Sequence, residues 1–358
     1  MLATLLGAGR QKALASPDLI EDHGFLRVNL DGHDVRLEGL IVKRADAQGR
    51  LPIALIVHGK PADLGSMDRE HTDSVARQAR DLAARGWLAV AAMHRGFGQS
   101  DGPYPAGMTC DPRALLHRLN GDADELAAVL NRVAQRPDAD ATRIIAIGVS
   151  AGGADAVALA ARNDPGLLAV VSVSGGLQIR NCPTWQDNLV AAEKTFGALA
   201  KMPQLWLYAR SDSFFEPLLV ERMRSAALDG GADIKLVMFN PMGSDGHDLF
   251  GMVLGRVAWL RELDAFLRYL KLPTWQLQEV DSVIAKAKAE ARSKPFVEGY
   301  FSAPREKVLA HSQATNSFWD GFGSPSLDEA RALALKSCAT KASDCTVVME
   351  NDSFVDQP

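Results

Sequence analysis

The stretch that decides the fold is RIIAIGVSAGGADAVALAAR, residues 143–162. It begins with a continuous apolar run, which is typical of a strand buried on both faces of a sheet. A helical pattern follows at once, and Ser150 stands at the junction. Gly148 and Gly152 have no Cβ, so neighbouring segments can approach a sharp turn that projects the serine hydroxyl outward. The stretch therefore predicts a nucleophilic serine beside helix amides that favour developing negative charge.

On both sides of this stretch, apolar runs alternate with amphipathic segments. The predicted strands are Phe25–Leu30, Val35–Lys43, Pro52–His58, Trp87–Met93, Arg143–Val149, Leu168–Val173, Gln204–Ala209 and Ile234–Phe239. The predicted helices are Ser74–Arg85, Asp122–Gln135, Ala151–Arg162, Gln186–Leu199, Glu216–Leu228 and Leu249–Leu270. The first two strands read as an antiparallel pair. The rest predict an α/β fold, in which an eight-stranded, mostly parallel sheet has helices on both faces.

The chain has 358 residues, more than one hydrophobic core usually holds, and its character changes after Pro273. We predict an N-terminal extension over residues 1–24, a catalytic domain over 25–274, and a C-terminal helix with a small accessory module over 275–358. In the last part, the periodicity predicts a charged helix over Trp275–Lys294, a helix over Leu327–Ser337 and a strand over Thr346–Glu350.

The charge, hydropathy and motifs of the chain limit the kinds of molecule that it is expected to bind. A formal net charge of −5 argues against non-specific nucleic-acid binding, and no apolar run is long enough to span a membrane. No Cys/His cluster has zinc spacing, and the glycine loop at Gly96-Phe97-Gly98 fails as a dinucleotide motif because Asp101 stands where the third glycine belongs. We therefore expect no metal and no cofactor. The expected partner is a small molecule, and the oligomeric state stays open.

A serine nucleophile needs a base, and the base needs an acid to orient it. Of the eight histidines, His247 is the one in the loop that follows the last predicted strand. Asp212 follows the strand before it, so the order is Ser150, Asp212, His247, as expected for a G-x-S-x-G nucleophile. Asp245 and Asp248 are rival acids. Two other interpretations stay open, a helix N-cap for Asp212 and a solvated loop residue for His247.

Two backbone amides are candidates for an oxyanion hole. One is the amide of Ala151, directly after the nucleophile. The other is the amide of Lys60, because Gly59 allows a turn that points it inward. His58 is expected to pack this turn rather than to act in catalysis.

Five segments resemble, in the same order, the α/β-hydrolase superfamily, and within it the dienelactone hydrolase-like and prolyl-oligopeptidase-like serine esterases. They are His58-Gly59, Arg95–Ser100, Gly148–Gly152, Ser211-Asp212 and Asp245–His247, and the resemblance covers residues 25–272. It implies a serine hydrolase that cleaves carboxylic esters through an acyl-enzyme intermediate. True dienelactone hydrolases carry a cysteine nucleophile, so Ser150 puts dienelactone activity in doubt. A weaker resemblance links the segment after residue 295 to a cysteine-containing module of some exported bacterial hydrolases.

The same resemblance places Lys60 and Arg95 in loops that border the oxyanion hole. Two cations there would favour a substrate with a carboxylate near the scissile bond. The competing interpretation is that Lys60 points to solvent and that Arg95 anchors its loop by pairing with an acidic residue.

Two other functions stay open. A peptidase or an aryl-acylamidase would use the same three side chains. The chain could also be a non-catalytic binding protein on a hydrolase scaffold, with residues 295–358 as its working part.

The four cysteines predict two disulfides and a periplasmic or secreted location. Cys110 and Cys182 lie in loops that leave the same edge of a parallel sheet and are expected to build the pocket. Cys338 and Cys345 flank a short turn. The alternative is four reduced cysteines in a cytoplasmic esterase. The apolar run Leu2–Ala8 is a poor export signal because basic residues follow it, and a truncated signal would fit the disulfides.

Overall fold

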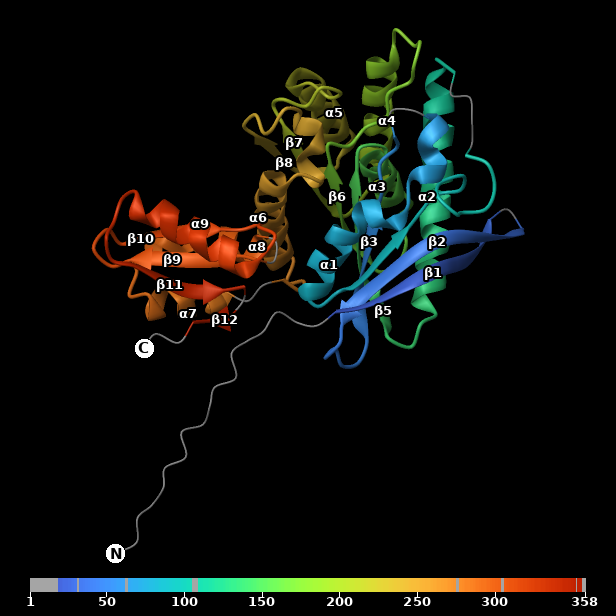
Figure 1. Cartoon of the computed structure of the whole chain (residues 1–358). Coiled ribbons are helices and arrows are strands. Elements are labelled where there is room, and N and C mark those ends of the chain that lie inside the picture. Colours follow the sequence, from blue (N-terminus) through green and yellow to red (C-terminus); the bar gives the residue numbers. More distant parts are fainter. Residues whose placement is uncertain are drawn as a thin grey trace, which may run out of the picture. The chain divides into compact units, whose positions relative to one another are not determined.

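A computed structural model describes residues 19–30, 32–61, 64–104, 109–274, 277–303, 306–351 and 353–355 (Figure 1). The contacts divide the chain into a larger unit, Pro17–Thr274, and a smaller one that contains Trp275–Pro358. The two units are described separately.

The larger unit is built on an eight-stranded sheet with the order β1-β2-β4-β3-β5-β6-β7-β8. Its strands are β1 (Leu19–Leu30), β2 (His33–Arg44), β3 (Leu51–Val57), β4 (Leu88–Ala92), β5 (Ala139–Val149), β6 (Leu167–Val173), β7 (Pro203–Ala209) and β8 (Asp233–Phe239). The pairs β1–β2 and β2–β4 are antiparallel, and the other neighbouring pairs are parallel. The predicted eight-stranded, mostly parallel sheet is confirmed.

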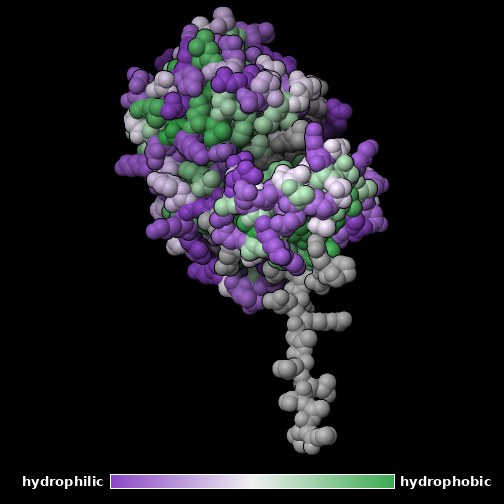
Figure 2. Space-filling view, turned by 90° about the vertical axis from the view of Figure 1, so that its left-hand side faces the viewer, coloured by the Kyte–Doolittle hydropathy of each residue, from purple (hydrophilic) through white to green (hydrophobic). Residues whose placement is uncertain are grey.

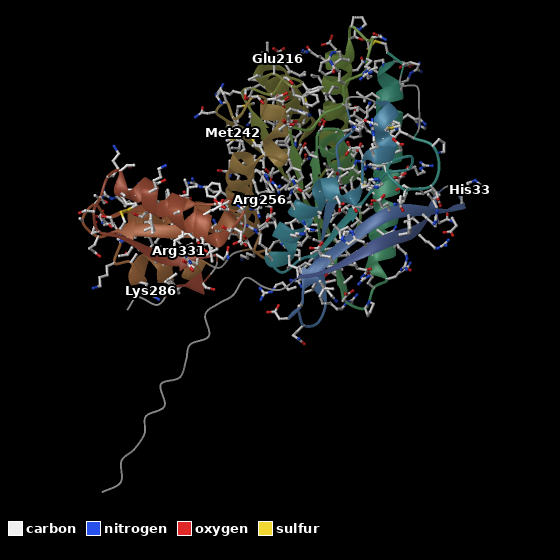
Figure 3. All side chains as sticks on the ribbon, in the orientation of Figure 1. His33, Glu216, Met242, Arg256, Lys286 and Arg331 are labelled. Carbon is white, nitrogen blue, oxygen red and sulfur yellow. A yellow bond between two sulfur atoms is a disulfide. The ribbon has the colours of Figure 1, made fainter. Side chains whose placement is uncertain are left out.

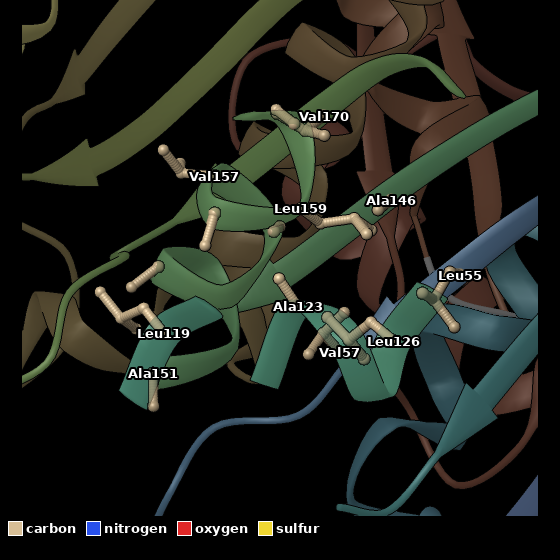
Figure 4. Packing of buried hydrophobic residues seen from close by; sticks show 14 of the residues in the cluster. Leu55, Val57, Leu119, Ala123, Leu126, Ala146, Ala151, Val157, Leu159 and Val170 are labelled. Carbon is tan, nitrogen blue, oxygen red and sulfur yellow. The ribbon is translucent and has the colours of Figure 1, made fainter. Parts of the chain in front are cut away.

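Helices cover both faces of this sheet, as predicted. One face carries α2 (Pro112–Ala134), α3 (Ala151–Arg162), α4 (Trp185–Leu199) and α5 (Pro217–Gly230), and the other carries α1 (Ala76–Ala84) and α6 (Val253–Tyr269). Side chains alternate between the two cores along β3. Leu55 and Val57 pack with α2 (Figure 4), whereas Ala54 and Ile56 belong to the core that contains α1 and α6. This two-sided burial explains why the central strands read as continuous apolar runs.

Two helix starts differ from the predictions. Helix α2 begins at Pro112, ten residues before the predicted Asp122, because the Asp111 side chain accepts a hydrogen bond from the amide of Arg113 and proline suits the first helical position. Helix α6 begins at Val253 rather than Leu249, because Gly246–Phe250 forms a short 3-10 helix, η3. Three more 3-10 helices are η1 (Leu64–Arg69), η2 (Thr72–Val75) and η4 (Ala291–Ser293).

Two buried ion pairs join α1 to α6. Asp81 accepts hydrogen bonds from Arg256, which Figure 3 labels on α6. At the end of α1, Arg85 donates from Nε and Nη2 to the carboxylate of Asp264, at 2.6 and 2.8 Å. The Arg85 and Asp264 side chains are only 2% and 6% exposed, so neither charge can be compensated by solvent.

The smaller unit has a four-stranded antiparallel sheet in the order β10-β9-β11-β12. Its strands are β9 (Val308–Ser312), β10 (Ser317–Gly321), β11 (Cys345–Glu350) and β12 (Ser353–Phe354). Helix α9 (Leu327–Ala339) packs in one cluster, while α7 (Leu277–Lys286) and α8 (Lys294–Ser302) pack in another. The single helix predicted over Trp275–Lys294 is wrong, because Lys288 turns the chain with a φ of 51°.

The surface is mixed in polarity. Figure 2 shows a face on which a hydrophobic area lies among hydrophilic residues. In the described ranges, no helix is both long and apolar enough to cross a membrane.

The structure contains both predicted disulfides. Cys110–Cys182 joins a position two residues before the start of α2 to the loop after β6. Cys338–Cys345 joins the end of α9 to the start of β11, across seven positions of sequence. The apolar run Leu2–Ala8, considered as an export signal, lies outside the described residues.

We expect alkylation of the unfolded, non-reduced protein from its native source to leave its intact mass unchanged. Reduction should then allow four alkylations, because all four cysteines are bonded. Intact mass spectrometry before and after reduction measures this directly. Four alkylated thiols without reductant would contradict both bridges and the oxidising compartment inferred from them.

Candidate active site

Ser150 occupies a strained turn between β5 and α3. Its φ of 55° and ψ of −122° lie outside the regions that non-glycine residues prefer. The two flanking glycines make the turn sterically feasible: a Cβ on Gly148 would collide with the carbonyl of Gly152, and a Cβ on Gly152 would collide with the carbonyls of Val57 and His58. The sequence thus folds locally so that the turn presents Ser150 at the N-terminus of α3.

The structure brings Ser150, His247 and Asp212 together in one hydrogen-bonded chain. His247 Nε2 lies 3.0 Å from Ser150 Oγ, and His247 Nδ1 lies 3.0 and 3.2 Å from the two carboxylate oxygens of Asp212. Asp212 is buried and also accepts from the backbone amides of Phe214 and Phe215, at 2.9 and 3.0 Å. Such a carboxylate can keep the proton of the neutral imidazole on Nδ1, which leaves Nε2 free to accept the serine proton.

The rival acids do not contact the imidazole ring of His247 within the described chain. Asp245 accepts from the backbone amides of His247 and Ser213, at 2.9 and 3.0 Å, and caps η3. Burial opposes ionisation of this carboxyl, but the hydrogen bonds from Ser213 and His247 lower its pKa. Asp248 is an exposed residue within η3. Asp212 is not the N-cap of the next helix, since Glu216 holds that position in α5.

Two unpaired amides stand near the serine. A Cβ on Gly59 would lie 3.3 Å from the Cβ of Ser150, so the turn after β3 packs against the nucleophile. Over the described ranges, the N–H groups of Lys60 and Ala151 donate to no protein acceptor. Both amides are therefore available to a negatively charged oxygen at this turn.

Two pockets flank the Ser150–His247 pair and share Lys60 and Pro61. The aromatic pocket, about 270 Å³, is also lined by Ala151, Gly176, Leu177, Gln178, Arg180, Phe214 and Phe215. The acidic pocket, about 410 Å³, is also lined by Gly59, Glu70, Ser74, Val75, Gln78, Val149, Asp248, Phe250, Gly251 and Met252. The linings of the two pockets differ in charge. Arg180 adds a second cation to the aromatic pocket, whereas Glu70 and Asp248 add two carboxyl groups to the acidic pocket.

Lys60 and Arg95 lie in different surroundings. The half-buried Lys60 lines both pockets, and burial lowers its pKa, with a further decrease from the charges of Arg118 and Arg180. Arg95 donates from Nε to Glu125 at 2.8 Å, and its backbone amide donates to the same carboxylate at 3.0 Å. The second cation beside the nucleophile is thus Arg180, and Arg95 is bound to an acidic residue as the competing interpretation proposed.

A buried polar cluster, which no sequence motif indicates, lies close to this turn. His94 Nδ1 lies 2.9 Å from Glu125, and His94 Nε2 lies 3.5 Å from Asp155. Burial opposes the charged form of His94, but the Asp155 and Glu125 carboxylates raise its pKa well above the usual range. Burial alone would raise the pKa of Glu125, yet His94 and Arg95 hold it near 2. Across the described residues, no group of three or more His, Cys, Asp or Glu side chains could hold a metal ion.

Parts of this chain are similar in sequence to known proteins. Residues 64–227 match the sequence profile of the family described as serine aminopeptidase, S33. "Putative esterase NocK" of Nocardia uniformis subsp. tsuyamanensis is 32% identical over 130 residues, which are 36% of this chain and 34% of that protein. The match thus spans about a third of the length of that curated relative.

Solved structures resemble the chain at lower identity. The esterase of Pyrococcus furiosus is 15% identical, with a TM-score of 0.49 over 69% of this chain and 90% of its own. A dienelactone hydrolase-like promiscuous phosphotriesterase from metagenomic libraries is 17% identical, with a TM-score of 0.45 over 62% of this chain and 82% of its own. The profile match agrees with this chain's own sheet order and strand–serine–helix turn. By these features, the chain has an α/β-hydrolase fold.

Proposed function

We propose that this protein is a serine hydrolase that cleaves carboxylic esters. The observation that carries the proposal is the continuous hydrogen-bonded chain from Ser150 Oγ through His247 to Asp212, with both links at 3.0 Å. The profile match supports a hydrolase, and the Nocardia relative, which is named as an esterase, supports an esterase. We assign catalysis to residues 25–274 and an accessory role to residues 275–358.

The geometry supports a two-step mechanism. Ser150 Oγ attacks the ester carbonyl carbon while His247 Nε2 takes its proton, and Asp212 stabilises the imidazolium that forms. The amides of Lys60 and Ala151 donate to the oxyanion of the tetrahedral intermediate. His247 then returns the proton to the departing alcohol and leaves an acyl group on Ser150. A water molecule, deprotonated by His247, hydrolyses that acyl-enzyme by the same route in reverse.

A fluorophosphonate probe tests the assignment of the nucleophile. We expect it to label the wild-type protein at Ser150 and to leave Ser150→Ala unlabelled. A folded wild-type protein that neither reacts with the probe nor hydrolyses 4-nitrophenyl acetate would instead favour a binding protein on a hydrolase scaffold. A peptidase or aryl-acylamidase would be labelled too, and it is recognised by faster turnover of a 4-nitroanilide than of the 4-nitrophenyl ester with the same acyl group.

The lining of the aromatic pocket predicts a preference for esters that carry an anionic group. Lys60 and Arg180 supply positive charge there, and Leu177, Phe214 and Phe215 supply apolar walls. We expect kcat/KM at low salt to be about tenfold higher for an ester with a terminal carboxylate than for a neutral ester of equal size. Added salt should reduce the ratio because it screens exposed charges.

Arg180→Gln should reduce this preference several-fold, whereas Glu70→Gln, which removes a charge from the acidic pocket, should not reduce it. Pairs of substrates with the carboxylate in the acyl half or in the alcohol half identify the half that occupies the aromatic pocket. Equal kcat/KM values for charged and neutral esters at low salt would contradict the prediction.

We further propose that the protein works in the periplasm or outside the cell. The two disulfides support this location, since such bonds persist mainly in oxidising compartments. The mass measurement described above tests it.

A further inference from the structure

The imidazole of His58 lies directly under the turn that carries the Lys60 amide. His58 follows β3 and is 3% exposed. Its Nε2 lies 3.0 Å from the backbone nitrogen of His94, and its Nδ1 lies 2.7 Å from the carbonyl oxygen of Gly59. Both ring nitrogens are thus engaged by backbone groups.

These two partners determine the tautomer of His58. A backbone N–H can only donate, so Nε2 must be the acceptor of the bond from His94. The ring proton is therefore on Nδ1, which donates to the Gly59 carbonyl. Burial lowers the pKa of His58 to about 3, with a further decrease from the charge of His94, so the ring stays neutral.

The bond to Gly59 constrains the peptide that supplies the Lys60 amide. The Gly59 carbonyl and the Lys60 N–H belong to one peptide unit, and in a trans peptide these groups point in opposite directions. Because the carbonyl is held toward the buried His58 ring, the Lys60 N–H points away from the core. Gly59 packs against Ser150, and Lys60 lines both pockets with it.

We propose that His58 is a positioning residue for the oxyanion hole: its Nδ1–H fixes the Gly59–Lys60 peptide so that the Lys60 N–H faces the developing oxyanion. This inference rests on the proposed esterase function. Glycine at position 59 makes such a constraint necessary, because glycine tolerates backbone conformations closed to other residues and the peptide could otherwise rotate. A rotated peptide would turn its carbonyl oxygen toward the oxyanion, so repulsion would replace a hydrogen bond.

The buried polar cluster holds His58 in turn. The His94 amide fixes its Nε2, while the His94 ring is bound by Glu125 and lies close to Asp155. Glu125 also binds the backbone amide and the guanidinium of Arg95, the next residue in the chain. A chain of hydrogen bonds thus links Arg95, through Glu125, His94 and His58, to the turn that carries the Lys60 amide.

Two substitutions separate the two hydrogen bonds of His58. In His58→Asn, the side-chain amide can occupy the Nδ1 position and donate to Gly59, but nothing accepts from the His94 amide. In His58→Gln, the side-chain oxygen can reach the Nε2 position and accept from His94, but the donor to Gly59 is lost. His33→Gln, at the exposed end of the β1–β2 hairpin (Figure 3), is the matched control.

We expect His58→Asn to retain kcat within about fivefold and His58→Gln to lose about 10²-fold, near the lower end of the loss seen when an oxyanion donor is removed. KM should change little in either variant. The melting temperatures should follow the opposite order, because His58→Asn leaves the buried His94 amide without an acceptor. Affinity for phenylboronic acid, which forms a tetrahedral adduct with a serine nucleophile, should fall in His58→Gln by the same factor as kcat/KM.

Equal loss of kcat in the two variants, or activity that follows the melting temperature, would overturn the inference, since a purely structural role predicts both. Wild-type turnover of 4-nitrophenyl acetate and labelling by the fluorophosphonate keep the proposed function separate. If wild type lacks both, the esterase assignment itself fails. If wild type has both and the variants are indistinguishable, only the role of His58 fails.

Discussion

Ser150→Ala, His247→Ala and Asp212→Asn are each expected to lower kcat by about 10³-fold or more. The three side chains form one hydrogen-bonded chain, so the loss of any member removes the activated nucleophile. The effects should therefore not add: the double variant of Ser150 and His247 should be about as inactive as either single variant. Steady-state kinetics with a 4-nitrophenyl ester, using folded variant protein free of wild-type contamination, measures these losses.

Asp248→Asn and Asp245→Asn are the controls for the acid. Asp245 binds backbone amides, Asp248 is exposed, and neither carboxylate contacts the imidazole ring in the described chain. We expect each to cost less than about tenfold, well below Asp212→Asn. Near-normal kcat in Asp212→Asn together with a large loss in either control would show that the acid is misassigned.

Asp264→Ala is expected to lower the free energy of unfolding by about 3–5 kcal/mol. The substitution leaves the Arg85 guanidinium buried without the carboxylate that receives two of its hydrogen bonds. This pair lies between α1 and α6, so its loss weakens the packing of both helices on the sheet. Urea unfolding followed by circular dichroism measures the change.

Asp34→Ala is the matched control, because Asp34 pairs with Arg27 on the surface, where both side chains are about two-thirds exposed. It should change the free energy of unfolding by less than about 1 kcal/mol. Similar values for the two variants would show that burial does not determine the strength of these pairs.

The central strands could be predicted because burial on both faces leaves a strong apolar signal. Short strands of mixed polarity gave no such signal, and β9 and β10 were missed for that reason. The first turns of α2 were missed although Asp111-Pro112 is a helix-start signal, since Asn120-Gly121, a dipeptide typical of turns, interrupts the helical pattern. Local periodicity thus predicts an element best where burial determines which of its faces are apolar.

The candidate site was predictable from chain order, because Ser150, Asp212 and His247 each follow a strand at the same edge of a parallel sheet. The partner of Arg95 could not be predicted. Glu125 lies on the buried face of α2, and no local pattern distinguishes a buried carboxylate from a solvated one. Arg180 was missed because loop conformation decides which cation reaches the pocket.

The Cys110–Cys182 bridge gives the two halves of the binding site different chemical sensitivities. At Cys182 it ends the segment whose Leu177, Gln178 and Arg180 line the aromatic pocket, and none of the described residues that line the acidic pocket belongs to that segment. A reductant in the assay buffer would therefore loosen one wall of the site and leave the other intact. The protein should therefore show different substrate preferences in assays with and without thiols. Protein expressed in a reducing cytosol should discriminate less between substrates.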